Sequence, residues 1–398
     1  MALLSGPPWE RNLRVLWLAQ LVAMIGMSAC IPFLPLYVRT LGASEAEAPF
    51  WSGLIYAAPF VMSSMLTPLW GALGDRYGQK SMVVRAIAGL AVSMTLMGFA
   101  TNVWWLLILR VFQGAVSGFV ASNNAFVSAT TPTEHVGKSL ATLQTSIAAG
   151  SVLGPFLGGA ISDAYGAEYV FYAVGILCLA SMAIIIRFIT EEPRGTKPGQ
   201  TRVVAGMRIA LRDSDLRLLL LIVLITQAAL VIPQPIVPYY IQELGAPQRW
   251  LSTITGVIVS MVGVCSIVSS RWWGARSDRL GYQPTMRTAS LIVLGGMLAQ
   301  AFVPSWEWLF PVRTVIGLAS GALIPLVYGE LARRSPMGRK GGIMGIASSA
   351  TLMGNLLGPL LCSAIAPWIP LPWVFVTSAV VMGVALGMSR WLRAPQSA

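Results

Sequence analysis

Few residues in this sequence are of the types that carry acid–base, nucleophilic or metal chemistry. His135 is the one histidine, and it follows Pro132 in a segment expected to be a solvated loop. No HExxH, P-loop or GxSxG pattern occurs, so the usual groups for zinc proteolysis, nucleotide hydrolysis and serine hydrolysis are missing. The cysteines stand singly in apolar runs, as small core residues do: Cys30, Cys178, Cys265 and Cys362. Because the acids also form no cluster at one depth, we expect no enzyme, no cofactor and no metal site.

Arg110 is a charged residue inside an apolar run, at 103–129. At 1.5 Å per residue it lies about 10 Å inside the outer end of that run. A guanidinium at that depth is costly, so it should face the interior and satisfy its donors on carbonyls, polar side chains, water or an anion. It either ties helices together or belongs to a site where charge matters. Arg313 repeats it nearer the end of its run, where snorkelling past Trp308 favours a structural role.

A polar segment, Gly71–Lys80, contains Asp75 and Arg76. Its glycines permit a tight reversal, Asp75 can accept hydrogen bonds from a neighbouring helix terminus, and the basic residues hold the segment on the inner side. The pair recurs as Asp278 and Arg279. We expect a latch that one conformational state makes and another breaks, weaker in the second copy because Pro284 replaces the last basic residue. The alternative is a basic loop that only sets topology.

Small residues recur every fourth position in the run 138–161. Ser146, Gly150, Gly154, Gly158 and Ser162 form one ridge, on which another helix can pack closely. Pro155 removes one backbone hydrogen bond and should bend the helix. Ala350, Gly354, Gly358 and Cys362 repeat the ridge. We interpret both as hinges, with static packing as the alternative.

Polar residues within the other apolar runs are candidates for a substrate cavity. Amides and aromatic rings, together with adaptable Met, suit neutral or amphipathic ligands of no fixed shape, although each residue is as well suited to bonding between helices. The candidates are Gln20, Tyr56, Asn123, Asn124, Gln144, Gln227, Gln234, Tyr328 and Asn355.

The elements that must position these residues are membrane helices. The chain has 398 residues, of which 56% are apolar and 11% are charged, against roughly 45–50% and 25% in soluble proteins. We predict an all-α integral membrane fold with twelve spans. They cover residues 13–38, 50–73, 81–100, 103–129, 138–161, 168–189, 216–241, 250–274, 285–303, 308–332, 343–366 and 372–392.

The net charge of +12 reflects topology. Of the 27 basic residues, 23 fall on the side that holds the N-terminus, and only Arg39 and Arg249 fall on the opposite side. The positive-inside rule then places both termini in the cytoplasm and the chain in the cell inner membrane. Neither a nucleic-acid partner nor a cleaved leader is expected.

The two halves of the chain repeat at a constant offset. Residues 71–78 return at 274–281, and Arg110, Gly114 and Gly118 return 203 residues later. We expect an N-terminal six-helix bundle at 1–190, a cytoplasmic linker at 191–215 and a C-terminal six-helix bundle at 216–398. Because each half has an even number of spans, the repeat is parallel, which is typical of transporters that enclose a midplane cavity.

These motifs resemble those of the major facilitator superfamily, in particular its twelve-span drug:proton antiporter branch. The segments that carry the resemblance are Gly71–Lys80, Leu106–Gly114 and Gly150–Gly159. The resemblance implies that Arg110 belongs to a proton-coupling network and that Gly154 and Pro155 shape an interface that prevents leak. The chain departs from many members in having no carboxylate in the first or fourth span. Its only acid well inside a span is Glu330, near the inner end.

The sequence therefore predicts a monomeric secondary transporter in the lipid bilayer. It should export hydrophobic or amphipathic drugs by alternating access in exchange for protons. Export of a sugar or a lipid-like metabolite is the alternative.

Overall fold

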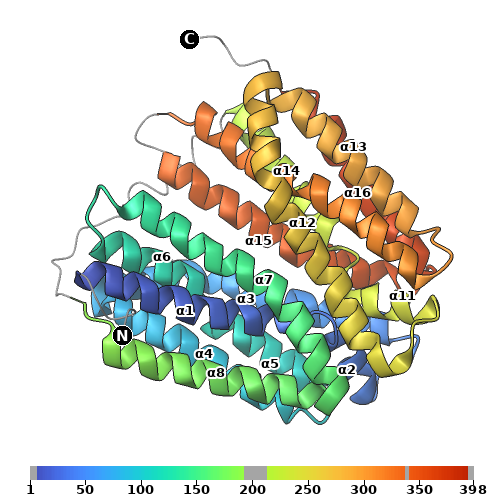
Figure 1. Cartoon of the computed structure of the whole chain (residues 1–398), viewed down its shortest axis with the longest axis horizontal. Helices are drawn as coiled ribbons and strands as arrows, with labels where there is room; N and C mark the ends of the chain where they lie inside the picture. Colours follow the sequence, from blue (N-terminus) through green and yellow to red (C-terminus); the bar gives the residue numbers. More distant parts are fainter. Residues whose placement is uncertain (1–6, 192–212, 337–339, 393–398) are drawn as a thin grey trace. The chain divides into compact units, whose positions relative to one another are not determined.

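A computed structural model describes residues 7–191, 213–336 and 340–392 (Figure 1). The described part is helical throughout and contains no strand. Eleven helical segments in it are long and apolar enough to cross a membrane. The ninth expected span, 285–303, forms helix α13 (Tyr282–Gln300), whose polar first half, with Arg287, leaves it outside that set.

The first six expected spans correspond to eight helices. They are α1 (Pro8–Ala29), α2 (Leu34–Thr40), α3 (Ala48–Tyr77), α4 (Gln79–Gly98), α5 (Val103–Val116), α6 (Phe119–Thr130), α7 (Val136–Tyr165) and α8 (Ala167–Phe188). The second six correspond to α10 (Ser214–Val231), η2 (Gln234–Ile236), α11 (Val237–Glu243), η3 (Gln248–Trp250), α12 (Leu251–Leu280), α13, η4 (Trp306–Trp308), α14 (Leu309–Arg334), α15 (Lys340–Ile365) and α16 (Leu371–Ser389).

Three spans expected to be continuous are broken. The first breaks between α1 and α2, where Pro32 and Pro35 lack backbone donors, and the seventh breaks at Pro233–Ile236 between α10 and α11. The fourth breaks between α5 and α6 at Ser117–Gly118, where Gly118 has a φ of 105°. Only glycine adopts this backbone at little cost.

The segment expected as a loop at 71–80 is mostly helix. Helix α3 runs through Tyr77, and the chain reverses at the single residue Gly78, whose φ is 91°. Gly281 makes the same reversal between α12 and α13, with a φ of 87°. The expected tight turn is thus reduced to one glycine in each half.

The chain forms two compact units, which we describe separately. The first contains residues 1–196 together with 246–260, and the second contains 197–245 together with 261–398. In the first, α1 packs most extensively on α7 and α4 on α8, and in the second α10 packs on α15 and α13 on α14 and α16. Each unit has its own apolar core. The bundle boundaries expected from the sequence remain a prediction, and most of the linker, 192–212, lies outside the described residues.

Candidate functional site

The glycine ridge of α7 packs directly on α1. A Cβ at Gly154 would overlap the Ser28 hydroxyl and the Ile25 carbonyl, and a Cβ at Gly158 would overlap the Ala29 carbonyl. The Ser28 Oγ also donates a hydrogen bond of 2.8 Å to the Gly150 carbonyl. The backbones therefore touch, as the spacing of four predicts. Gly354 and Gly358 of α15 pack in the same way on α10.

A second face of α7 contacts the start of α12, within the first unit. A Cβ at Gly256 would overlap the carbonyl of Pro155, and one at Gly159 would overlap the carbonyl of Ser252. The Ser260 Oγ donates to the Val152 carbonyl at 2.6 Å. Helix α7 thus has close backbone contacts on two sides.

Asp163 caps the first turn of α12. Its Oδ1 accepts from the Ser252 N–H at 3.1 Å, and its Oδ2 accepts from the Thr253 N–H at 2.7 Å. These are donors that the helix itself leaves unpaired, and the helix dipole favours a negative charge there. The sequence analysis did not identify Asp163, because its partners lie 89 and 90 residues away.

Arg110 is buried in the first unit, as its position in the span predicted. It is 7% exposed and donates through Nη1 to the Gln113 Oε1 at 3.1 Å. It also lies beside the side chain of Cys30. Its Nε has no partner among the described residues, and none of the ion pairs found there involves Arg110. Helix α5, which carries it, begins at the Asn102 cap on the Trp105 N–H. Arg313 is buried as well, at 5% exposed, so it does not snorkel as expected.

Arg85 supports the break in the fourth span, a role that the sequence analysis missed. Its Nη1 and Nη2 donate to the carbonyls of Val116 and Ser117 at 3.2 and 3.1 Å. Its guanidinium also stacks over the Trp70 ring at 3.6 Å from the centroid. Arg85 therefore occupies carbonyls that the interrupted helix leaves free. The sequence analysis had grouped it with the basic residues that set topology.

The reversal at Gly78 is held by contacts to the end of α8. The Glu191 carboxylate accepts from the N–H groups of Gln79 and Lys80, both at 2.8 Å, and so caps α4. The Lys80 Nζ donates to the carbonyls of Ile186 and Ile189 at 3.1 and 2.7 Å, near the C-terminus of α8. Asp75 was expected to accept hydrogen bonds from a neighbouring helix terminus. Among the described side chains, Glu191 makes this kind of contact at the reversal.

The other predicted latch residues are exposed or lie outside the description. The side chain of Asp75 is not among the described residues, and Arg76 is exposed beside Tyr77. In the second copy, Asp278 pairs with Arg333 at 3.0 Å, while both side chains are more than half exposed. Arg279 is exposed.

Four of the nine cavity candidates form two amide pairs, one in each unit. Asn123 donates to the Gln20 Oε1 at 2.8 Å, and Gln20 donates to the Leu143 carbonyl at 3.0 Å. Gln227 donates to the Asn355 Oδ1 at 2.8 Å. The first pair is fully buried. The pair therefore joins α1, α6 and α7, as expected if these residues bond helices to one another.

The other candidates differ in their surroundings. The Tyr56 hydroxyl donates to the Ile31 carbonyl at 2.7 Å, Tyr328 bonds the Thr351 hydroxyl at 3.0 Å, and Gln144 is exposed. Among these nine candidates, three have a buried amide oxygen with no partner among the described residues. They are Asn123 Oδ1, Asn124 Oδ1 and Gln234 Oε1, and each is an acceptor that a ligand or water can use.

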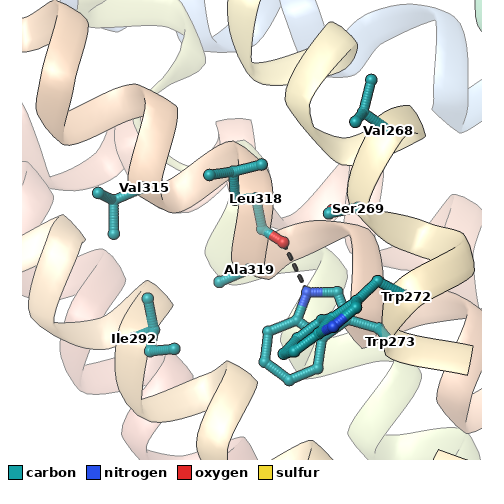
Figure 2. Close-up of a pocket in the computed structure, with 8 residues that line it drawn as sticks. All are labelled: Val268, Ser269, Trp272, Trp273, Ile292, Val315, Leu318 and Ala319. Carbon is teal, nitrogen blue, oxygen red and sulfur yellow. Dashed lines mark hydrogen bonds between the residues drawn. The ribbon is translucent and has the colours of Figure 1, made fainter. Parts of the chain in front are cut away.

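An apolar groove of about 430 Å³ lies in the second unit (Figure 2). Figure 2 shows its lining from α12, α13 and α14: Val268, Ser269, Trp272, Trp273, Ile292, Val315, Leu318 and Ala319. The Trp273 indole donates to the Leu318 carbonyl at 2.6 Å. None of the polar cavity candidates lines this groove, so it does not correspond to the predicted substrate cavity.

An ionic cluster lies at one end of the second unit. Arg334 donates through Nε to the Glu330 Oε1 at 2.7 Å and through Nη1 to the Asp215 Oδ2 at 2.6 Å. The Glu330 side chain is 4% exposed, against 15% for Arg334 and 22% for Asp215. The sequence analysis had found the isolated acid but not its partners.

Comparison with known proteins shows the family to which the chain belongs. The family model for the Major Facilitator Superfamily matches residues 16–299 and 219–398. The chain belongs to this superfamily. It is therefore a multi-pass membrane transporter and not an enzyme, and the predicted fold class is confirmed.

Relatives and solved structures agree with this membership. The chain is 34% identical to the multidrug resistance protein MdtG of Citrobacter koseri over 94% of this chain and 93% of that protein. It is 33% identical to MdtG of a Rahnella species over 96% and 93%. Its fold matches a bacterial homologue of the human lysosomal transporter Spinster, with a TM-score of 0.80, 15% identity and coverage of 98% and 100%. It also matches the nucleoside transporter NupG, with a TM-score of 0.81, 11% identity and coverage of 96% and 98%.

Proposed function

We propose that this superfamily member exports hydrophobic or amphipathic drugs in exchange for protons, by alternating access. The relatives named multidrug resistance proteins support drug export, because they align over nearly the whole chain. The bias of basic residues supports a place in the cell inner membrane with both termini in the cytoplasm. We further propose that the protein acts as a monomer.

The strongest support from the structure for alternating access is the two-sided packing of α7. Gly154 and Gly158 bring its backbone onto α1, while Pro155 and Gly159 bring it onto α12. Backbone contact of this kind leaves no space for water, which suits a seal that must not leak protons. The Asp163 cap adds a polar contact that water can replace when the seal opens.

We propose that Arg110 takes part in proton coupling and that the charged residues at the two glycine reversals take part in gating. Arg110 is buried with one donor unused, so it is placed to respond to a change of charge or hydration nearby. Asp75, Arg76, Asp278 and Arg279 are proposed to form state-dependent contacts at the two glycine reversals.

The substrate class follows from the amide groups. The unpartnered oxygens of Asn123, Asn124 and Gln234 accept hydrogen bonds but carry no charge. Uncharged acceptors beside apolar helix faces suit amphipathic molecules with a donor group, and do not demand a fixed shape.

Dye accumulation in cells tests this proposal. Cells that overproduce the chain should accumulate less of a hydrophobic dye than cells with an empty vector, and a protonophore should abolish the difference. Unchanged accumulation across a broad dye panel would count against drug export and would favour a sugar or lipid-like metabolite. Efflux that survives the protonophore would contradict proton exchange.

A further inference from the structure

The Glu330 cluster of the second unit places two carboxylates on one guanidinium. Glu330 and Arg334 lie one turn apart near the end of α14, and Asp215 lies in the first turn of α10. Arg334 bonds both acids at once, at 2.7 and 2.6 Å. Counted together, these three groups carry one negative charge in excess, which the binding of a single proton would neutralise.

The groups around Glu330 come from two neighbouring helices and from its own helix. From α10 it faces Asp215 and from its own helix Arg334, while α13 contributes Tyr282, whose electrostatics Glu330 influences. The Tyr282 hydroxyl is buried and has no hydrogen-bond partner among the described residues. In the first turns of α15, through Ala347, the described side chains are apolar, and Ile343 and Ala347 are fully buried. The side chain of Lys340 is outside the description. Arg333 points instead to Asp278.

The repeat places uncharged residues at the positions of this cluster in the first unit. At the offset of 203, Asp215, Tyr282, Glu330 and Arg334 correspond to Asn12, Gln79, Val127 and Thr131. None of these four carries a charge. In the first unit Asn12 is buried and simply donates to the Thr190 carbonyl at 2.9 Å. In the first unit the neighbouring turn at Gln79 is capped by the Glu191 carboxylate, so the two units place their carboxylates differently at this end, and the arginine shared by two carboxylates is a feature of the second unit.

We propose that Glu330 is the carboxylate that binds and releases the exchanged proton, with Arg334 and Asp215 adjusting how tightly it is held. This assignment rests on the proton exchange proposed above. In the outward-open state a proton from water on the outer side adds to Oε2 and neutralises the carboxylate, while Oε1 keeps its bond to the Arg334 Nε. When the drug loads, the proton leaves to water on the cytoplasmic side, and Glu330 again shares Arg334 with Asp215. One proton is bound and one released per cycle, with no other reactant.

The test is proton release from the full chain, purified in detergent and titrated with the hydrophobic dye rhodamine 6G in weak buffer. Dye binding is followed by fluorescence polarisation and release by a pH indicator. The native chain should release protons as it binds dye. Glu330→Gln should still bind dye, while its release falls to background, because the carboxylate assigned to the proton is gone and Arg334 keeps its pair with Asp215.

Asp215→Asn is the matched variant, since it removes the other carboxylate from the same arginine. It should still release protons, with the pH dependence of release shifted to lower pH, because a neighbouring negative charge is lost. Glu45→Gln, which alters the exposed pair with Arg39, should release as the native chain does.

Release from dye-bound Glu330→Gln at the native level would overturn the assignment. Should Glu330→Gln fail to fold, an unshifted pH dependence in Asp215→Asn would also overturn it. Dye binding without release by the native chain would instead refute proton exchange itself, and with it this assignment.

Discussion

The fourth spans of the two halves are built differently at equivalent residues. In the first half the helix breaks at Ser117–Gly118, and Arg85 binds the freed carbonyls and covers Trp70. In the second half α14 runs unbroken through Ser320 and Gly321. Thr288 stands where Arg85 would be, and bonds only the Pro284 carbonyl in its own helix.

The difference shows how one motif supports two backbones. Trp70 donates to the Ala115 carbonyl at 2.8 Å, and its repeat partner Trp273 donates to the Leu318 carbonyl at 2.6 Å. The indole contact is therefore common to both halves. Arg85 is present only in the first half, where the fourth span is broken. Where the arginine is absent, the residues around Trp273 line an open groove.

Exchanging the repeat residues should give the largest effect. Arg85→Thr removes two hydrogen bonds from a charged donor to free carbonyls, so we expect a loss of about 3 kcal/mol or more in stability. The measurement is thermal unfolding of the purified protein. The reciprocal Thr288→Arg should bring no gain, because α14 leaves no free carbonyls there. Equal melting temperatures for Arg85→Thr and the native chain would refute the supporting role.

Alanine substitutions in the two glycine ridges should differ in their cost to stability, by less than the exchange at Arg85. At Gly154 an added Cβ would overlap the Ser28 hydroxyl and lie 2.6 Å from the Ile25 carbonyl, whereas at Gly358 the nearest atoms are the Val231 Cγ2 at 2.5 Å and the Ala228 carbonyl at 2.8 Å, so the backbone is met less closely there. We expect Gly154→Ala to lose about 1 to 3 kcal/mol and most of the efflux, and Gly358→Ala to lose less. Gly345→Ala, which meets open space, is the control. Equal losses in both ridge variants would contradict the distinction.

Two substitutions of Arg110 distinguish a role in proton coupling from a role in folding. Arg110→Lys keeps the charge but loses the planar set of donors that reaches Gln113. We expect normal folded yield by size-exclusion chromatography and poor efflux in cells. Arg110→Leu, measured in parallel, should lose folded yield because Gln113 is left unpaired. Normal efflux in Arg110→Lys would rule out the coupling role.

The exposed pair in the second half should matter least to stability. Asp278→Asn removes an ion pair in which both side chains are mostly in solvent, so a change of about 0.5 kcal/mol or less is expected. Thermal unfolding would check this, beside Glu191→Gln, which removes the charge from a cap on two N–H groups and should cost more. A larger loss in Asp278→Asn would show that the second reversal is the stronger latch.

The sequence was most informative where a pattern repeats along one helix. The spacing of Gly150, Gly154 and Gly158 predicted the ridge, and the single charge in an apolar run predicted the burial of Arg110. Contacts between distant segments were not visible. Arg334 meets Asp215 across 119 residues. The carbonyls that Arg85 binds lie 31 and 32 residues away in the chain. The helix breaks were missed because apolar runs continue through them, although Pro32, Pro233 and Gly118 stand at the breaks.

Uphill transport in proteoliposomes is the most direct test of proton-coupled drug export. The purified chain, reconstituted in vesicles with an acidic interior and an alkaline exterior, should concentrate rhodamine 6G inside, and a protonophore should release it. Vesicles that contain Glu330→Gln should equilibrate the dye without concentrating it. Failure of the native chain to accumulate dye above protein-free vesicles, with the pH gradient shown to be intact, would contradict the account.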